Sequence, residues 1–169
     1  WLRAAGCTVE ICSGDRPAAV GAVAARLGLA QWQGGVSPAD KLRHLQALAA
    51  QGRRVLMVGD GLNDAPALAA AHVSMAPATG TDVSQAAADI VFQGASLLAV
   101  PQALDLARAA DRLMRQNLGL ALCYNLAAVP LAILGYVTPL VAALAMSSSS
   151  ILVIGNALRL GRSPGRTKG

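Results

Sequence analysis

The first 96 residues alternate short apolar runs with amphipathic segments, a pattern typical of a parallel α/β sheet with helices between its strands. The run at 53–59 is bounded by arginine and glycine, as expected of a fully buried strand. Strands are predicted at residues 8–12 (TVEIC), 53–59 (RRVLMVG), 72–76 (HVSMA) and 89–92 (DIVF). Helices are predicted at residues 16–29, with Val20, Val23, Ala24 and Leu27 on one face, and 37–52.

The helix at 37–52 carries clear signals at both of its ends. Ser37 can cap the first turn, Pro38 suits the first helical position, and Asp40 stands three residues after the cap. Gly52 follows the last helical residue. These signals place the N-terminus of the helix next to the polar segment that precedes it.

The pattern changes after the α/β region, because the stretch from Arg115 to Arg159 contains no charged residue between its two ends. Two membrane helices of roughly 20 residues each would fill it, and we expect them at about 116–135 and 139–158, with a break at GYVTP. A buried hairpin of a soluble protein is the alternative, which so long an uncharged stretch disfavours. The domains are therefore expected at residues 1–96, 97–160 (a connecting helix and the hairpin) and 161–169, a disordered cytoplasmic tail.

Composition supports a membrane protein over a nucleic-acid-binding one. Hydrophobic residues make up 54% of the chain, charged residues 14% and aromatic residues 3%, and the net charge is +5. The arginines flank the apolar hairpin, which places both of its ends in the cytoplasm, and aromatic side chains for base stacking are scarce. The cysteines, Cys7, Cys12 and Cys123, form no CxxC pair, which fits a reducing compartment for the first part. Because the chain begins with Trp1 and no signal peptide, we expect a fragment of a longer protein.

Polar residues follow two of the predicted strands. Asp60 comes directly after the run at 53–59, between two glycines, and Asp64 stands four residues later. Ser13 and Asp15 follow an earlier strand, and Lys41 lies in the first turns of the capped helix. Ligands of open α/β sheets bind beyond the carboxyl ends of the strands, and carboxylate oxygens suit Mg²⁺. Taken alone, each segment could equally be a turn with capping aspartates.

These segments, SGD, PADK and GDGLNDAPAL in this order, resemble the phosphorylation domain of P-type ATPases, which has the haloacid-dehalogenase-like (Rossmannoid) α/β fold. The resemblance makes Asp60 a Mg²⁺ ligand with Asp64 beside it in the same motif, and it brings Lys41 to the phosphorylated aspartate. It assigns the phosphoryl and nucleotide side to Ser13–Asp15. The full set of catalytic residues that it implies is Ser13, Gly14, Asp15, Lys41, Asp60, Asn63 and Asp64.

One element of the family pattern is not in this sequence. The family's nucleophilic aspartate lies in a DKTGT string, which the chain does not contain. Aspartyl-phosphate chemistry needs that nucleophile, so the fragment alone is expected not to hydrolyse ATP. We expect the nucleotide-binding and actuator domains to lie in the missing N-terminal part of the same protein.

The apolar hairpin carries a second group of polar residues. Tyr124 and Asn125 lie in its first helix, and Met146 and Ser150, four residues apart, share a face of the second. Such residues either join helices to one another or line a transport pathway. A site without carboxylate or lysine but with a thioether disfavours Zn²⁺ and Ca²⁺ and fits Cu⁺.

The hairpin also resembles the copper-transporting branch of the heavy-metal P-type ATPases. The matching positions are Asn117, Tyr124, Asn125, Pro130, Met146, Ser149 and Ser150. The resemblance implies Tyr124, Asn125, Met146 and Ser150 as Cu⁺ ligands, with Asn117 and Ser149 as further candidates. The resemblance implies an ATP-driven Cu⁺ export pump in the inner membrane of a bacterium, with Mg²⁺ and ATP as cofactors. It extends to the subgroup that serves assembly of respiratory haem-copper oxidases, and a copper chaperone is a candidate partner. Two alternatives stay open: a pump for Zn²⁺, Cd²⁺ or another cation, and a membrane-anchored phosphatase of the same fold.

Overall fold

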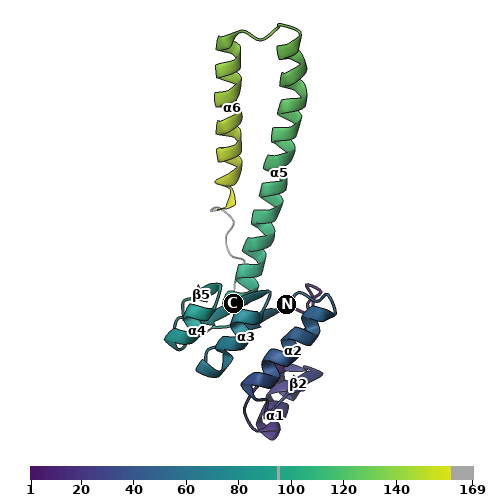
Figure 1. Cartoon of the computed structure of the whole chain (residues 1–169), viewed down its shortest axis with the longest axis vertical. Coiled ribbons are helices and arrows are strands. Elements are labelled where there is room, and N and C mark those ends of the chain that lie inside the picture. The colour runs from purple at the N-terminus through teal and green to yellow at the C-terminus, as the bar shows by residue number, and fades with distance from the viewer. Residues whose placement is uncertain (95, 161–169) are drawn as a thin grey trace. The chain divides into compact units, whose positions relative to one another are not determined.

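The computed structural model describes residues 1–94 and 96–160, and the chain divides into two units, Trp1–Ala99 and Val100–Gly169 (Figure 1). Among the described residues, the first unit contains all the strands and four short α-helices, and the second is a helical hairpin. The predicted tail at 161–169 lies outside the described residues. Each unit is described by itself below.

The strands of the first unit form two parallel sheets. β1 (Glu10–Cys12) pairs with β2 (Gln31–Gln33), and β3 (Leu56–Val58), β4 (Val73–Pro77) and β5 (Ile90–Phe92) pair in that order. The parallel α/β prediction is confirmed, with two differences. The ladder among the described residues is divided between β1 and β3, and β2 was not predicted because its Gln-Trp-Gln sequence forms no apolar run.

The helices of the first unit connect successive parallel strands, as parallel pairing requires. They are α1 (Pro17–Leu27), α2 (Pro38–Ala50), the 3₁₀ turn η1 (Leu62–Asp64), α3 (Ala65–Ala70) and α4 (Asp82–Ala87). Ser37 caps α2 by accepting a hydrogen bond from the Asp40 amide at 3.2 Å, and Thr81 caps α4 in the same way through Ser84. The signals read from the sequence at the start of α2 are therefore those that the structure uses.

The core of the first unit is small, and only half of the predicted apolar face of α1 contributes to it. Val20 and Ala24 are buried, whereas Val23 and Leu27 are about half exposed. A Cβ on Gly34 would lie 2.7 Å from the Cα of Pro17, so α1 packs closely on the loop after β2 at this point. The remaining buried apolar side chains of this unit are Leu45, Ala67, Leu68, Met75, Ala76 and Phe92.

A polar contact at the edge of this small core ties β4 to the start of β5. The Asp89 carboxylate accepts hydrogen bonds from the amide and the hydroxyl of Ser74, at 2.8 and 2.9 Å. The Asp89 amide in turn donates to the Ser74 hydroxyl at 3.1 Å. Ser74 is fully buried, so this exchange satisfies groups that would otherwise be costly to bury.

The second unit consists of α5 (Ala99–Ile133) and α6 (Pro139–Ala157), joined by a short loop. Gly135 has a φ of 78°, a conformation that favours glycine, and Thr138 caps α6 through the Val141 amide. Both helices are long and apolar enough to cross a membrane, and their apolar windows are not buried. The segment at 97–115 was predicted as a connecting helix that leads into the hairpin, and from Ala99 onward it is helical and continuous with the first hairpin helix.

Replacing Ser37 with alanine removes the cap of α2 and should cost about 1 kcal/mol of local stability. Hydrogen exchange of the amides in the first turn of α2 should therefore accelerate about fivefold. Thr81→Ala is the matched control, because it removes the corresponding cap from α4 and should leave exchange in α2 unchanged. Unaltered exchange in α2 of the Ser37→Ala variant would show that the cap does not hold this helix.

Candidate functional site

A cleft opens where β1 and β3 end, at the carboxyl edge of both sheets. Its volume is about 340 Å³. It is lined by Ser13, Gly14, Asp15, Val36, Pro38, Lys41, Gly61, Asn63 and Asp64. All of the predicted catalytic residues except Asp60 thus line one cleft, and Val36, Pro38 and Gly61, which were not predicted as site residues, complete its wall.

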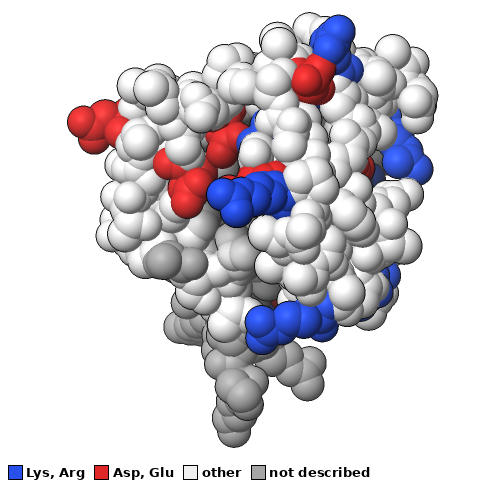
Figure 2. Space-filling model, turned by 90° about the horizontal axis from the view of Figure 1, so that it is seen from below, with Lys and Arg blue, Asp and Glu red and all other residues white. Residues whose placement is uncertain are grey.

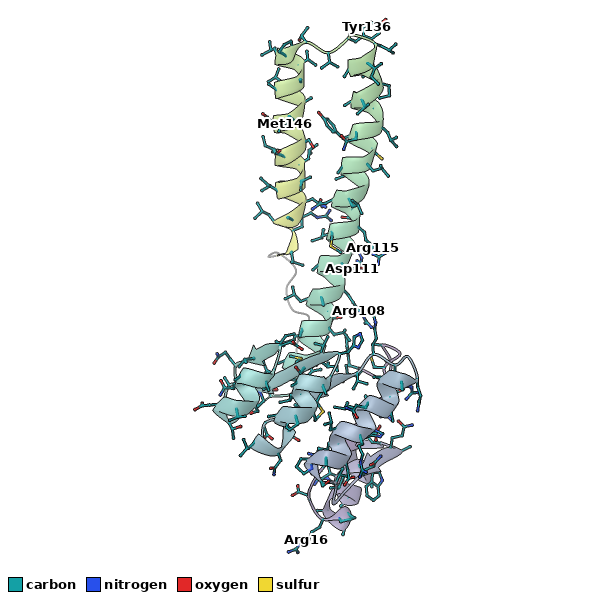
Figure 3. All side chains as sticks on the ribbon, viewed as in Figure 1. Arg16, Arg108, Asp111, Arg115, Tyr136 and Met146 are labelled. Carbon is teal, nitrogen blue, oxygen red and sulfur yellow. The ribbon has the colours of Figure 1, made fainter. Side chains whose placement is uncertain are left out.

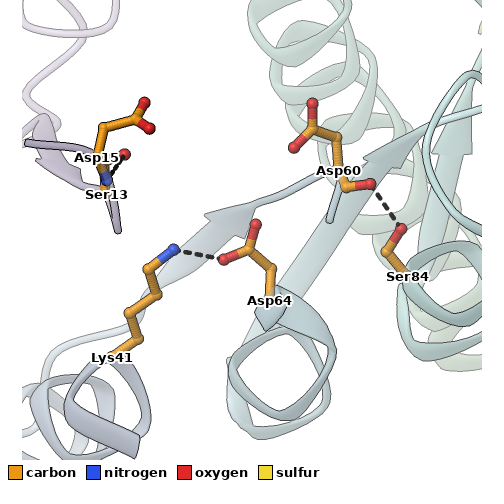
Figure 4. A network of polar contacts seen from close by, with 6 residues as sticks. All are labelled: Ser13, Asp15, Lys41, Asp60, Asp64 and Ser84. Atoms are coloured by element: carbon orange, nitrogen blue, oxygen red, sulfur yellow. Dashed lines mark hydrogen bonds and ion pairs between the residues drawn. The ribbon is translucent and has the colours of Figure 1, made fainter. Parts of the chain in front are cut away.

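An ion pair in the cleft joins Lys41 on α2 to Asp64 at the end of η1 (Figure 4). The Lys41 Nζ lies 2.6 Å from the Asp64 Oδ1, and the two side chains are 10% and 14% exposed. An ion pair this sheltered from water is held firmly, and loss of one partner would leave an uncompensated charge. The pair therefore fixes the ammonium group of Lys41 at the cleft. The other two hydrogens of this ammonium group remain available to an anionic ligand.

Glycines allow the turn after β3 to close tightly around Asp64. A Cβ on Gly59 would lie only 2.8 Å from the Cβ of Asp64, so any other residue at this position would displace the carboxylate. Gly80, in the loop after β4, is equally restricted, because its Cβ would lie 2.9 Å from the backbone oxygen of Asp60. Both glycines permit the close backbone approach on which the geometry of the two aspartates depends.

Asp60 is held by its backbone and presents its carboxylate to solvent. Its carbonyl oxygen accepts hydrogen bonds from the Thr81 amide and the Ser84 hydroxyl, both at 3.1 Å. Ser84 is completely buried, so the loop and helix after β4 fix this position (Figure 4). Sequence reasoning missed Thr81 and Ser84, although Thr81, followed three residues later by Ser84, does mark a helix start. Among the residues that the structure describes, no ion pair engages the Asp60 carboxylate.

The opposite wall of the cleft is the turn that follows β1. The Ser13 hydroxyl accepts a hydrogen bond from the Asp15 amide at 3.2 Å. The backbone of the same turn is tied to the loop after β2: Gly35 donates to the Asp15 carbonyl at 2.6 Å and Val36 to the Ser13 carbonyl at 3.0 Å. The unpredicted strand β2 therefore positions this wall.

Two titratable groups near the cleft have altered pKa values. Burial raises the pKa of the Cys12 thiol, at the end of β1, while the positive charge of Lys41 acts in the opposite direction. The hydrogen bond from Ser37, followed by that from Arg43, lowers the pKa of Asp40. The contacts of ionised Asp40 therefore stabilise α2 at pH values above the ordinary pKa of an aspartate. This stabilisation is lost as the pH falls through the lowered pKa of Asp40.

The charges around the first unit are mixed in sign. Figure 2 shows acidic and basic side chains next to one another on the face that it presents, with neither sign covering that face. A broad basic surface of the kind that attracts nucleic acid is not seen on the described part of this face. The arrangement fits a site for a small charged ligand better than a polyanion-binding surface.

The second predicted group of residues lies on the hairpin. Tyr124 and Ser149 are half-buried, and Met146, labelled on α6 in Figure 3, is 71% exposed. Asn125 is exposed and donates to the Ala121 carbonyl at 2.8 Å, and Ser150 donates to the Met146 carbonyl at 3.1 Å. Asn117 accepts a hydrogen bond across the hairpin from Asn156 at 2.8 Å, a contact that was not predicted. Pro130 lies inside α5 without ending it.

Comparison with known proteins identifies the fold and the relatives. Residues 1–72 match the haloacid dehalogenase-like hydrolase family. Over 94% of its length the chain is 58% identical to the nitrogen fixation protein FixI of Bradyrhizobium diazoefficiens, and over 95% it is 45% identical to the "Probable copper-exporting P-type ATPase V" of Mycobacterium tuberculosis. It covers only 22% and 21% of these relatives.

A solved structure of a zinc-transporting PIB-type ATPase aligns with 94% of the chain, at a TM-score of 0.85 and 38% identity. The chain covers 26% of that protein. This alignment includes the hairpin as well as the α/β unit, since the α/β unit alone is much shorter than 94% of the chain. The chain therefore corresponds to part of a P-type ATPase and is similar over nearly its whole length to the PIB-type branch.

Proposed function

We propose that the chain is part of an ATP-driven Cu⁺ export pump, in which its first unit serves the phosphorylation reaction and its hairpin contributes to the ion pathway. The observation that carries the proposal is the cleft in which Lys41 and Asp64 meet beside the turn at Ser13–Asp15. The same chain continues into an uncharged hairpin. The proposal extends to the whole protein, of whose relatives this chain spans about a fifth.

The residues of the cleft suit the stabilisation of a phosphoryl group. Lys41 would neutralise negative charge on the phosphoryl oxygens, and the Ser13 hydroxyl and the backbone amides of its turn would donate hydrogen bonds to them. Asp64 would keep the ammonium group of Lys41 in place, as it does at 2.6 Å in this structure. The phosphorylated aspartate itself would come from another part of the protein.

Mg²⁺ fits the donor chemistry at the end of β3. The Asp60 carboxylate is exposed, carries no ion pair among the described residues, and has its backbone fixed from two sides. Magnesium is commonly held by one or two carboxylates together with water and substrate phosphate. Asp60 would hold the ion directly, and Asp64, engaged by Lys41, would act beside it. When bound, the ion would supply charge neutralisation for the transferred phosphoryl group.

The hairpin supplies ligands suited to a soft monovalent ion. The thioether of Met146 is a soft donor, and Tyr124 and Asn125 add oxygen atoms without negative charge. We assign these three residues and Ser150 as ligands of Cu⁺. Asn125 and Met146 are exposed, so other membrane helices could pack beside them and add ligands to the same ion. We also propose that the pump belongs to the subgroup that supplies copper to respiratory oxidases. The sequence resemblance of the hairpin supports this assignment.

The hairpin would span the inner membrane of a bacterium, with both ends in the cytoplasm. Arg115 lies just before the uncharged stretch and Arg159 just after it, so the positive charges flank it on the same side. The remaining part of the same protein and a copper chaperone would be the partners of this part. A second candidate, a zinc pump, is favoured by the similarity to the zinc-transporting ATPase at 38% identity.

Replacing Asp60 with asparagine should reduce Mg²⁺-dependent ATPase activity of the full-length protein by about a hundredfold or more, because one carboxylate ligand of the ion is lost. Phosphoenzyme formation from labelled ATP measures the same loss directly. Asp105→Asn is the matched control, since it makes the same change at an exposed position on α5 and should retain activity. Full activity of the Asp60→Asn variant would contradict the assignment of this residue.

Replacing Met146 or Asn125 with alanine should raise the Cu⁺ concentration needed for half-maximal ATPase stimulation by about tenfold, because a ligand of the transported ion is removed. Met114→Ala, at another exposed methionine of the hairpin unit, should leave this concentration unchanged. The same titration with Zn²⁺ separates the two candidate pumps. Activity that is indifferent to both metals would instead favour a membrane-anchored phosphatase.

Replacing Lys41 with methionine should slow the alkylation of Cys12 by iodoacetamide at pH 8. The positive charge of Lys41 lowers the pKa of this thiol, so its removal raises the pKa further and reduces the reactive thiolate. We expect a decrease of about twofold or more. Arg43→Met, on the exposed side of the same helix, should not change the rate. An equal or faster alkylation rate in the Lys41→Met variant would show that the charge of Lys41 does not act on the Cys12 thiol.

A further inference from the structure

A polar contact joins the two helices of the hairpin near its open end. The Asn156 Nδ2 donates a hydrogen bond to the Asn117 Oδ1 at 2.8 Å and makes a longer contact of 3.4 Å with the Gln116 Oε1. Arg159 donates to the Asn156 Oδ1 at 3.2 Å, so the amide of Asn156 is engaged at both of its ends. Asn117 and Asn156 are half-buried, whereas most of the residues around them are exposed.

The burial pattern of the two helices agrees with this contact. Half-buried positions recur at helical spacing along α5 and along α6, and mark the faces that the two helices turn toward each other. From Leu113 onward they are Leu113, Asn117, Ala121, Tyr124 and Ala128 on α5, and Ala145, Ser149, Val153 and Asn156 on α6. Counting equal steps away from the Asn117–Asn156 pair brings Tyr124 opposite Ser149 and Ala128 opposite Ala145. Both residues of each of these two matched positions are half-buried, in agreement with the register that the hydrogen bond sets, whereas Ala121 and Val153 fall opposite the exposed Leu152 and Leu120.

The surroundings of Asn117 are those of a helix contact and not of a cation site. The side-chain oxygen of Asn117 already accepts a hydrogen bond from Asn156. The positively charged Arg159 in turn contacts the side-chain amide of Asn156. Asn117 also stands seven residues before Tyr124, about 10 Å along the helix axis. A bound Cu⁺ could not be shared by the two side chains over this separation.

We propose that Asn156 is a positioning residue whose hydrogen bond to Asn117 sets the register of α6 against α5. This register holds Met146 and Ser150 at the level of Tyr124 and Asn125. Asn117 thereby acts through the hairpin geometry and is removed from the set of candidate Cu⁺ ligands. In an apolar environment, an asparagine pair is well suited to this role, because a shifted register would leave both amides without partners. The inference deepens the proposed pump function and rests on it for its effect on transport.

The register can be measured directly by cross-linking in the full-length protein in lipid nanodiscs. Cysteines at Ala128 and Ala145 form the matched pair, and cysteines at Ala128 and Ser149 form a pair offset by one turn. A short bismaleimide, with mass spectrometry to identify the linked peptides, should join the matched pair at least fivefold more efficiently. Adding Asn156→Leu, an apolar replacement of similar size, should reduce this preference to less than twofold. A preference that survives Asn156→Leu would overturn the proposal.

Two further variants separate the hydrogen bond from general packing. Asn117→Asp keeps an acceptor oxygen for the Asn156 amide and should keep the cross-linking preference, whereas Asn117→Leu should lose it. Gln116→Leu is the control, because it removes only the longer 3.4 Å contact and should behave as the unmodified protein. Equal behaviour of Asn117→Asp and Asn117→Leu would show that the hydrogen bond does not define the register.

The effect on transport is read from metal-stimulated ATPase activity. Asn156→Leu should raise the metal KM about threefold or more while changing kcat by less than twofold, since the ligands are displaced but the phosphorylation cleft is untouched. A fall in kcat with an unchanged KM would contradict a positioning role. If the unmodified protein shows no metal stimulation, the proposed pump function fails, while the cross-linking result still decides the register.

Discussion

The ion pair between Lys41 and Asp64 joins the two ladders of the α/β unit at its candidate site. The strands of this unit form two separate ladders among the described residues, and α2 follows one ladder while Asp64 follows the other. At 2.6 Å and with both side chains sheltered from solvent, the pair fastens these two parts at the point where the cleft opens. The contact that joins the two ladders is therefore also the one that places a positive charge in the site, and loss of either residue would leave the other charge uncompensated.

The polar residues of the cleft and those of the hairpin are held in place in different ways. In the cleft, glycines let the backbone approach closely, and loops that are distant in sequence fix the positions of Asp60 and Asp64. In the hairpin, the side chains of Asn125 and Ser150 bond to carbonyls one turn earlier in their own helices. The residues of the cleft all come from the α/β unit, and only the phosphoryl group that they would stabilise comes from elsewhere. The hairpin leaves its exposed residues, Met146 above all, to be enclosed by other parts of a membrane protein.

Much of this could be predicted from sequence because the signals are local. The cap of α2, the apolar runs of β3 and β4, and the uncharged hairpin each follow from residues close together in the chain. What could not be predicted depends on contacts between distant residues: β2 has no apolar run, Ser84 reaches back to Asp60, and Asn156 meets Asn117 across the hairpin. The exposed half of the predicted α1 face has the same origin, since periodicity shows that a face is apolar but not how much of it is covered.

The division of the sheet has a consequence for how the chain behaves in isolation. Within the described residues, β1 and β3 each have a neighbour on one side only, so each presents a row of backbone amides and carbonyls on the other. Such edges, when flat and apolar, recruit strands from other molecules. Leu56 on β3 is partly exposed, which adds an apolar side chain to that edge. Strand pairing with other molecules is thus a risk at these two edges, and a parallel strand inserted between β1 and β3 would cover both of them.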